Sequence, residues 1–392
     1  MRTKWKATQL FLLNSLEMGG SEKKIVAVAN ALHRRGWPVH LAYLNPPETL
    51  LGQLLPDLPR ICLGRSSRFD LGVVRRLAAY VQAEGVENIH CVNRYPLIYG
   101  RLVAPRRADG TLGLTAFLNS TDLPSQIEQA KMILYAPLLR ACRGVIFGCR
   151  YQREMWVRRY GLAPDRCSYI YNGVRADHFD PDRLPAQLRL LRSQLGWKQS
   201  DIVVGMVGQL RAKKGYPDFI SACAALRRDG FAVKALIVGG GPERAALERL
   251  ARTTGLAEHI RFVGEMSDVR QALYAMDVFA LTSVKSETFS NAALEAMAMA
   301  RPVVLSQLGG AAEMVDAGRS GYLYQVGDVD GLIAHLRRLA EDAEHRRELG
   351  REARQRVLAR FTFERMIDGY EAVLRSVGTG LQPVTESPTV NG

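Results

Sequence analysis

The chain has 392 residues, of which 47% are hydrophobic and 23% are charged, and its formal net charge is +14. This composition is typical of a soluble, globular protein with two domains, and no apolar run reaches the roughly 20 residues of a membrane-spanning helix. The six cysteines show neither a CxxC pair nor metal-ligand spacing, which disfavours zinc and a disulfide framework.

The apolar stretch from Leu10 to Leu16 is short and is interrupted by Asn14 and Ser15. Glu17 follows it in place of the small residues that a signal peptidase needs. We therefore expect no signal peptide and a cytoplasmic protein.

The positive charge is concentrated in the first half, where residues 1–180 hold about 25 Lys and Arg against about 14 Asp and Glu. Arginine and aromatic residues are interleaved there: Arg101, Arg106, Arg107, Arg150, Tyr151, Arg153, Trp156, Arg158, Arg159 and Tyr160. Such a cluster suits an anionic membrane surface, where each basic residue contributes on the order of 1 kcal/mol. An ordinary solvated face explains it equally well, and nucleic acid is disfavoured because no recognition signature accompanies the charge.

Short apolar runs alternate with amphipathic helical patterns along the whole chain, which is typical of parallel sheets covered by helices. In the first half, a helix is predicted over 21–35, and strands are predicted over 9–15, 39–44, 88–93, 113–119 and 144–149. In the second half, strands are predicted over 201–208, 233–240, 260–264, 278–283 and 301–306. The predicted fold class is α/β, with two doubly wound, Rossmann-like domains.

The Asn-Gly, Asp and Pro residues of the segment 171–185 indicate a linker. We predict one domain over 1–178, a second over 179–360, a C-terminal helix over 361–378 and a disordered tail over 379–392.

Ligands of open α/β sheets bind at the carboxyl ends of the strands, so the turns that follow strands are candidate sites. Gly19 and Gly20 follow the first predicted strand and precede a helix, where the backbone can approach a ligand closely. Alone, such a pair is usually just a turn. The chain has no GxGxxG, which disfavours a nicotinamide-dependent dehydrogenase.

A cationic loop follows the first strand of the second domain, where Gly208 and Gly215 bracket Arg211, Lys213 and Lys214. Cations at the mouth of a cleft are what a diphosphate leaving group requires, because negative charge builds on its oxygens as the bond breaks. The alternative for this loop, taken alone, is a charged surface loop. We expect it to lead into a helix capped near Pro217.

Two glutamates stand eight positions apart in "SETFSNAALEAMAMARP". Glu287 is predicted in a loop, Ser290 or Asn291 is predicted as the N-cap, and Glu295 lies about one turn inside the helix. The free N–H groups at the helix start form an anion site, and flanking carboxylates can accept hydrogen bonds from hydroxyls. The pattern therefore suits a nucleotide sugar, and the alternative is two solvated surface acids.

The motifs "GGSEKK", "GQLRAKKG", "VGGGPER", "RFVGEMSDV" and "SETFSNAALEAMAMARPVV…GGAAEMV" occur in this order. The series resembles the retaining nucleotide-sugar glycosyltransferases of glycosyltransferase family 4, over about residues 10–374. The resemblance implies a GT-B fold: an N-terminal acceptor-binding domain faces a C-terminal donor-binding domain across a cleft, and the last helix crosses back to the first domain. It also implies transfer without a metal or a cofactor, with a nucleotide-diphosphate sugar as co-substrate.

The resemblance implies roles at matching positions. Glu287 would contact the donor sugar, Glu295 would bind the ribose hydroxyls, and Lys214 with Arg211 would neutralise the leaving group. The other donor-binding residues that it implies are Gly19, Gly20, Gly208, Gln209, Glu265, Met266, Phe289, Ser290 and Asn291. The acceptor would be a glycan or a lipid-linked sugar at the cytoplasmic membrane face, in surface polysaccharide or exopolysaccharide synthesis.

Two positions depart from the family pattern. Gln209 stands where the family often has Arg, and Asn119 stands where many members have a His three residues before an Asp, here Asp122. We predict that Asn119 and Asp122 bind the acceptor, although Asn119 cannot titrate. The departures keep two alternatives open: a non-catalytic GT-B protein that binds a nucleotide sugar or a glycan, and a sugar-nucleotide epimerase, which needs no acceptor.

The stretch "GDVDG" resembles a metal-binding Asp-x-Asp motif. Because it precedes a helix, we expect Asp328 or Asp330 to act as the helix cap, and we predict no metal site.

Overall fold

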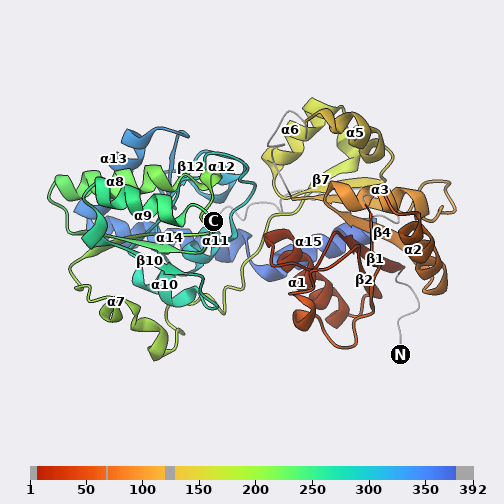
Figure 1. Cartoon of the computed structure of the whole chain (residues 1–392), viewed down its shortest axis with the longest axis horizontal. Coiled ribbons are helices and arrows are strands. Elements are labelled where there is room, and N and C mark those ends of the chain that lie inside the picture. Colours follow the sequence, from red (N-terminus) through yellow and green to blue (C-terminus); the bar gives the residue numbers. More distant parts are fainter. Residues whose placement is uncertain (1–6, 68, 120–128, 377–392) are drawn as a thin grey trace, which may run out of the picture. The chain divides into compact units, whose positions relative to one another are not determined.

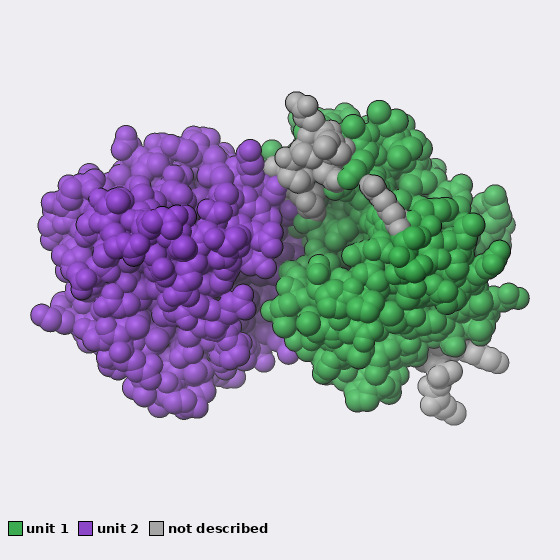
Figure 2. Space-filling model, viewed as in Figure 1, with its two compact units in different colours: residues 1–170, 367–392 green, residues 171–366 purple. Residues whose placement is uncertain are grey.

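The computed structural model describes residues 7–67, 69–119 and 129–376. The chain divides into two compact units (Figure 2): unit 1 runs to Ile170 and resumes at Ile367, and unit 2 runs from Tyr171 to Met366. The first division lies eight residues before the boundary predicted at 178/179, and the second lies six residues after the boundary predicted at 360/361. The predicted tail, 379–392, lies outside the described residues.

Unit 1 contains a seven-stranded, fully parallel sheet in the order β3-β2-β1-β4-β5-β6-β7. Its strands are β1 Thr8–Leu13, β2 Val39–Tyr43, β3 Arg60–Cys62, β4 Val86–Val92, β5 Leu114–Leu118, β6 Gly144–Phe147 and β7 Cys167–Tyr169. Its helices include α1 Gly20–Arg34, α2 Leu71–Ala83, α3 Arg94–Val103, α5 Met132–Arg140 and α6 Arg150–Tyr160. The five predicted strands are present, and the sequence reading missed the three-residue strands β3 and β7.

Unit 2 contains a six-stranded parallel sheet in the order β10-β9-β8-β11-β12-β13. Its strands are β8 Ile202–Val207, β9 Val233–Val238, β10 Ile260–Gly264, β11 Val278–Leu281, β12 Val303–Ser306 and β13 Tyr322–Tyr324. Its helices are α7 Leu191–Gln194, α8 Tyr216–Arg228, α9 Arg244–Thr253, α10 Arg270–Ala275, α11 Asn291–Ala298, α12 Ala311–Met314, α13 Val329–Glu341 and α14 Ala343–Arg360. The prediction of two Rossmann-like domains is confirmed.

Central strands of both sheets are buried on both faces, which explains why they appear as continuous apolar runs. In β1, every residue from Leu10 to Leu13 is at most 1% exposed. Helices pack on the sheets and on one another; in unit 2, α8 packs against α9 and α13, while α11 packs against α14 (Figure 1). Parallel strands end together, so each sheet has one carboxyl edge, where the turns after its strands gather.

The last helix, α15 Phe363–Ser376, begins in unit 2 and continues into unit 1. Within unit 1, Tyr370 is buried and stacks on Phe117 of β5, with ring centroids 5.3 Å apart. Arg35, which caps the end of α1, donates a hydrogen bond of 2.6 Å to Asp368. No helix in the described part of the chain is long and apolar enough to cross a membrane.

Candidate functional site

The cationic loop of unit 2 is fixed to the end of β11. Gly215 has φ +66°, and a Cβ at this position would overlap the carbonyl oxygen of Thr282. The Thr282 hydroxyl donates 2.8 and 3.1 Å hydrogen bonds to the carbonyl oxygens of Gly215 and Lys214. Gly215 itself is the N-cap of α8. The cap was predicted near Pro217, and it lies two residues before that proline. Only glycine fits such a close approach in a left-handed conformation.

The Lys214 ammonium lies against Glu287 at the carboxyl edge. Lys214 Nζ donates a 2.7 Å hydrogen bond to Glu287 Oε2, and Ser283 Oγ donates a 2.8 Å bond to the same oxygen. Both charged side chains are largely buried. Ser286, directly before Glu287, has φ +58°, a conformation that costs a non-glycine residue on the order of 1 kcal/mol or more. The chain thus accepts local strain where it presents this carboxylate.

The start of α11 lies directly after this carboxylate. Ser290 is the N-cap, and its hydroxyl accepts a 3.3 Å hydrogen bond from the backbone N–H of Ala293. Phe289 is buried and stacks on Tyr171, with centroids 4.9 Å apart. The predicted N-cap at Ser290 is confirmed, and Glu295 lies within the helix, partly buried.

The turns after β8, β9 and β10 pack into one surface. The Leu210 N–H donates a 2.8 Å hydrogen bond to Gly240 O, and a Cβ at Gly239 would overlap Gly208 O. A Cβ at Gly240 would lie 2.9 Å from Glu265 Oε1. The structure therefore brings together the predicted residues Gly208, Gln209, Glu265 and Met266, along neighbouring strand ends of one sheet. Arg211, in the same turn as Gln209, is exposed.

In unit 1, the two predicted glycines differ in their surroundings. Gly20 has open space where a Cβ would stand, whereas at Gly19 a Cβ would overlap the Glu22 carboxylate. Burial raises the pKa of Glu22 above its ordinary value. Glu22 is thus folded back over Gly19, and the open approach lies at Gly20.

The predicted acceptor residue Asn119 follows β5, and its Oδ1 accepts a hydrogen bond from the ammonium of Lys24 on α1. The other predicted acceptor residue, Asp122, lies outside the described residues.

Sequence reasoning missed the hydroxyls of Thr282 and Ser283, which hold the lysine loop and the carboxylate. Both residues are buried, at 1% and 0% exposure. Their position in the sequence could have identified them. They directly follow the buried strand β11, and side chains just after a strand lie at the carboxyl edge of the sheet. Asp328 caps α13 by accepting a 2.9 Å bond from the Gly331 N–H, as predicted. Within the described ranges, no group of three or more His, Cys, Asp or Glu side chains could hold a metal ion.

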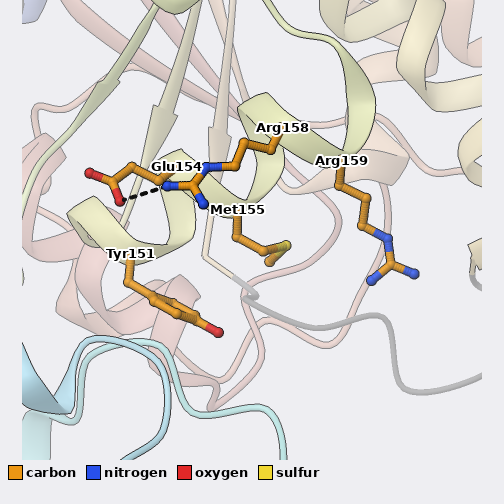
Figure 3. A pocket seen from close by; sticks show the side chains of 5 residues that line it. All are labelled: Tyr151, Glu154, Met155, Arg158 and Arg159. Carbon is orange, nitrogen blue, oxygen red and sulfur yellow. Dashed lines mark ion pairs between the residues drawn. The ribbon is translucent and has the colours of Figure 1, made fainter.

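The arginine and aromatic residues of α6 are divided between two faces of the helix, and each face holds both kinds of residue. Trp156 is buried against Phe147, and Arg153 donates a 2.7 Å hydrogen bond to Cys167 O, so both serve the interior of unit 1. Figure 3 shows the residues of α6 that line an open hollow of about 370 Å³: Tyr151, Glu154, Met155, Arg158 and Arg159.

Known proteins match this chain in both halves. The family description Glycosyltransferase Family 4 matches residues 18–178, and Glycosyl transferases group 1 matches residues 189–356. The putative glycosyltransferase EpsD of Bacillus subtilis is 26% identical over 353 residues, which cover 86% of this chain and 90% of EpsD. N-acetyl-alpha-D-glucosaminyl L-malate synthase of Bacillus anthracis is 30% identical over 187 residues, which cover 48% of this chain and about half (49%) of that relative.

Among solved structures, HepE of Anabaena in complex with UDP aligns with a TM-score of 0.83 and 24% identity, over 94% of this chain and 100% of HepE. A glycosyltransferase from Rickettsia africae aligns with a TM-score of 0.82 and 16% identity, over 96% of this chain and 100% of that one. These likenesses establish the fold. That fold is GT-B, and the two family matches show that the chain belongs to glycosyltransferase family 4.

Proposed function

We propose that this protein is a retaining, metal-independent glycosyltransferase. It would move a sugar from a nucleotide-diphosphate sugar to a glycan or a lipid-linked glycan during surface polysaccharide or exopolysaccharide synthesis. The observation that carries the proposal is the cluster of Lys214, Ser283 and Glu287, in which two donors bind one carboxylate oxygen. Relatives named for lipopolysaccharide core synthesis and for phosphatidylinositol mannoside synthesis support this class of pathway.

The two oxygen atoms of the Glu287 carboxylate have different surroundings in this cluster. Oε2 accepts from Lys214 and Ser283, while Oε1 accepts no hydrogen bond from the residues that the structure describes. A carboxylate oxygen only accepts, so Oε1 suits the hydroxyls of a donor sugar. Ser283 and Lys214 would fix the side chain before the sugar arrives.

Lys214 supplies the charge that the leaving group needs. An ammonium has three N–H donors, and one of them is directed at Glu287. The other two suit the oxygens of a diphosphate, with Arg211 in the same loop and the N–H groups at the start of α11 as further anion ligands. Fixed donors of this kind stabilise the charge that develops during bond cleavage.

Retention would follow from attack on the face that the nucleotide leaves. The acceptor hydroxyl bonds to the anomeric carbon as the bond from that carbon to the diphosphate oxygen breaks. A donor phosphate oxygen takes the hydroxyl proton, so no protein base is needed. Holding the two substrates together would supply much of the rate enhancement.

The test is calorimetric titration of the purified protein with UDP-, GDP- and ADP-sugars. We expect one of them to bind, and UDP-sugars are the first choice because HepE has been solved with UDP-glucose. Glu295→Ala should weaken binding at least tenfold, whereas Glu341→Ala, which changes an exposed glutamate at the end of α13, should not. A folded protein that binds none of the three contradicts the proposal. Binding without transfer to any acceptor favours the non-catalytic alternative, and epimer formation without an acceptor favours the epimerase.

We propose that the acceptor is reached at an anionic membrane surface through α5 and α6. Ile133 and Leu134 on α5 are 78% and 72% exposed. Arg140, at the end of α5, donates a 2.7 Å hydrogen bond to Tyr160 O, so this helix adjoins the one that carries the outward Arg158. Exposed apolar side chains beside cations suit a headgroup boundary.

Cosedimentation with vesicles tests this membrane contact. The protein should bind phosphatidylglycerol-containing vesicles at low salt, and Ile133→Asn with Leu134→Asn should reduce binding several-fold. Leu358→Asn, at a leucine that is 45% exposed on α14 of unit 2, is the matched control and should bind as the wild type does. Equal binding by all three proteins, or no binding at low salt, contradicts the membrane proposal.

A further inference from the structure

The chain enters unit 2 through a short segment whose backbone pairs with the segment by which the chain leaves this unit. The Val174 N–H donates a 2.9 Å hydrogen bond to Phe361 O, and the Phe363 N–H donates a 2.9 Å bond to Val174 O. A Cβ at Gly173 would overlap Thr362 O, so the two segments approach each other closely. The Asn-Gly pair in the segment predicted as a linker therefore has a fixed place within unit 2.

The side chain of Asn172 reaches the residue that precedes the N-cap of α11. Asn172 Nδ2 donates a 2.8 Å hydrogen bond to Phe289 O, and Ser290 is the N-cap. The carbonyl oxygen one position earlier, Thr288 O, accepts a 2.8 Å bond from the Gly310 N–H, which lies in the turn before α12. Two successive carbonyl groups are thus held by donors immediately before the helix begins.

Holding these carbonyl groups controls the sign of the charge that the start of α11 presents. In a trans peptide the C=O and the N–H point in opposite directions, so a carbonyl held on one side leaves its N–H on the other. The first N–H groups of a helix have no acceptor within that helix, and they attract anions. Asn291, which begins α11, is exposed, and Ala292 is partly buried. A carbonyl oxygen that turned towards an anion at this place would repel it.

The position of this peptide unit relates it to one phosphate of the donor. Phe289 stands two residues after Glu287, and Glu287 pairs with Lys214, the cation proposed for the leaving group. The peptide unit that Asn172 holds is therefore on the side of the phosphate that carries the sugar.

We propose that Asn172 is a positioning residue for the donor diphosphate: by holding the Phe289 carbonyl, it keeps the start of α11 directed, as an anion site, at the phosphate that carries the sugar. The inference rests on the proposed function. It adds to that function a residue from the segment by which the chain enters unit 2.

The experiment compares UDP with UMP as probes, by calorimetry on the full chain; if the donor titration selects another base, the diphosphate and monophosphate of that base replace them. Asn172→Leu keeps the size of the side chain but removes the donor. We expect it to bind UDP at least fivefold more weakly than the wild type does, and to bind UMP within twofold, because UMP lacks the phosphate that carries the sugar.

Tyr171→Phe is the matched control in the same segment. It removes the 2.7 Å hydrogen bond from the Tyr171 hydroxyl to Glu313 Oε2 but keeps a ring to stack on Phe289. The variant should bind UDP and UMP within twofold of the wild type, even where its thermal midpoint is lower.

Asn172→Asp tests the donor with a side chain of the same shape, and it carries the test if Asn172→Leu does not fold. An ionised carboxylate only accepts hydrogen bonds and repels the Phe289 carbonyl oxygen, so the loss of UDP affinity should equal or exceed that of Asn172→Leu. With saturating nucleotide sugar, kcat of either Asn172 variant should fall on the order of tenfold, because charge builds on the leaving phosphate as the bond breaks. Tyr171→Phe should keep its kcat.

Three results would overturn the inference: equal losses of UDP and UMP affinity in the Asn172 variants, unchanged UDP affinity in both of them, or a selective loss of UDP affinity in Tyr171→Phe as large as theirs. Each of these results leaves the proposed function intact, because the wild type still binds the donor. Failure of the folded wild type to bind any nucleotide sugar contradicts the proposed function instead, and with it the inference.

Discussion

The carboxyl edges of the two units are built differently. In unit 2, backbone approaches that only glycine permits, at Gly215 and Gly239, join neighbouring turns, and buried hydroxyls hold Lys214 and Glu287. In unit 1, Gly20 faces open space, and the contact between Lys24 and Asn119 joins side chains. The unit 2 edge is therefore joined through its backbone, which would preorganise the proposed donor site. In unit 1 this contact depends on two side chains, so a substitution can remove it without a change in the backbone.

The most direct way to break this contrast is Gly215→Ala. The new Cβ would overlap Thr282 O at a positive φ, so we expect the free energy of unfolding to fall by about 2–3 kcal/mol and nucleotide-sugar binding to weaken at least tenfold. Gly230→Ala is the matched control, because Gly230 has φ +91° but open space around it. It should cost about 1 kcal/mol and leave binding unchanged. If Gly215→Ala and Gly230→Ala changed nucleotide-sugar binding equally, the close backbone approach at Gly215 would not be what holds the site. Urea unfolding and calorimetry measure both quantities.

A second test removes charge from the unit 2 edge without touching the backbone. Lys214→Met should lower kcat on the order of 100-fold, because the leaving group loses a fixed cation. Lys213→Met removes the same charge from the adjacent, exposed position and should change kcat less than twofold. Steady-state kinetics with the identified donor measures both. Similar losses in the two variants would mean that general positive potential matters, and not the contact with Glu287.

A third test concerns acid stability. His90 of β4 is buried beside Phe11 and Phe117, and burial lowers its pKa to about 3. The unfolded chain therefore binds a proton that the folded chain does not between pH 6.5 and about 3, so stability falls as the pH falls through this window. The slope is on the order of 1 kcal/mol per pH unit. His90→Gln should flatten the pH profile in urea unfolding more than His259→Gln in unit 2, because His259 is less buried. Identical slopes for wild type and His90→Gln would contradict this assignment.

The smallest expected effect is at Asp328. Asp328→Ala removes the N-cap of α13 and should cost about 1 kcal/mol, while donor binding stays the same with or without added Mg²⁺. Asp330→Ala, in the first helical turn, should cost only a few tenths of a kcal/mol. A Mg²⁺-dependent loss of donor binding in Asp328→Ala would overturn the capping role.

Much of the fold could be predicted from the sequence, because central strands buried on both faces produce long apolar runs. The missed strands β3, β7 and β13 have three residues each, too few for a periodic signal. The N-cap at Ser290 follows from local chemistry and was predictable. The pairing of Lys214 with Glu287 joins residues 73 positions apart, and single-sequence patterns carry no information about such a distance. The inward position of Trp156 could have been predicted, because Arg158, two positions later on a helix with a 3.6-residue period, lies on nearly the opposite face.

The course of α15 has a consequence for synthesis on the ribosome. Residues 1–170 of unit 1 are synthesised first. Tyr370, which stacks on Phe117 within unit 1, is synthesised only after all of unit 2. Since chains emerge at about 5–20 residues per second, the apolar surface that receives α15 stays uncovered for roughly 10–40 s. The domain that is translated first is therefore the last to be completed, and a fragment that stops at Ile170 would be expected to need help from chaperones.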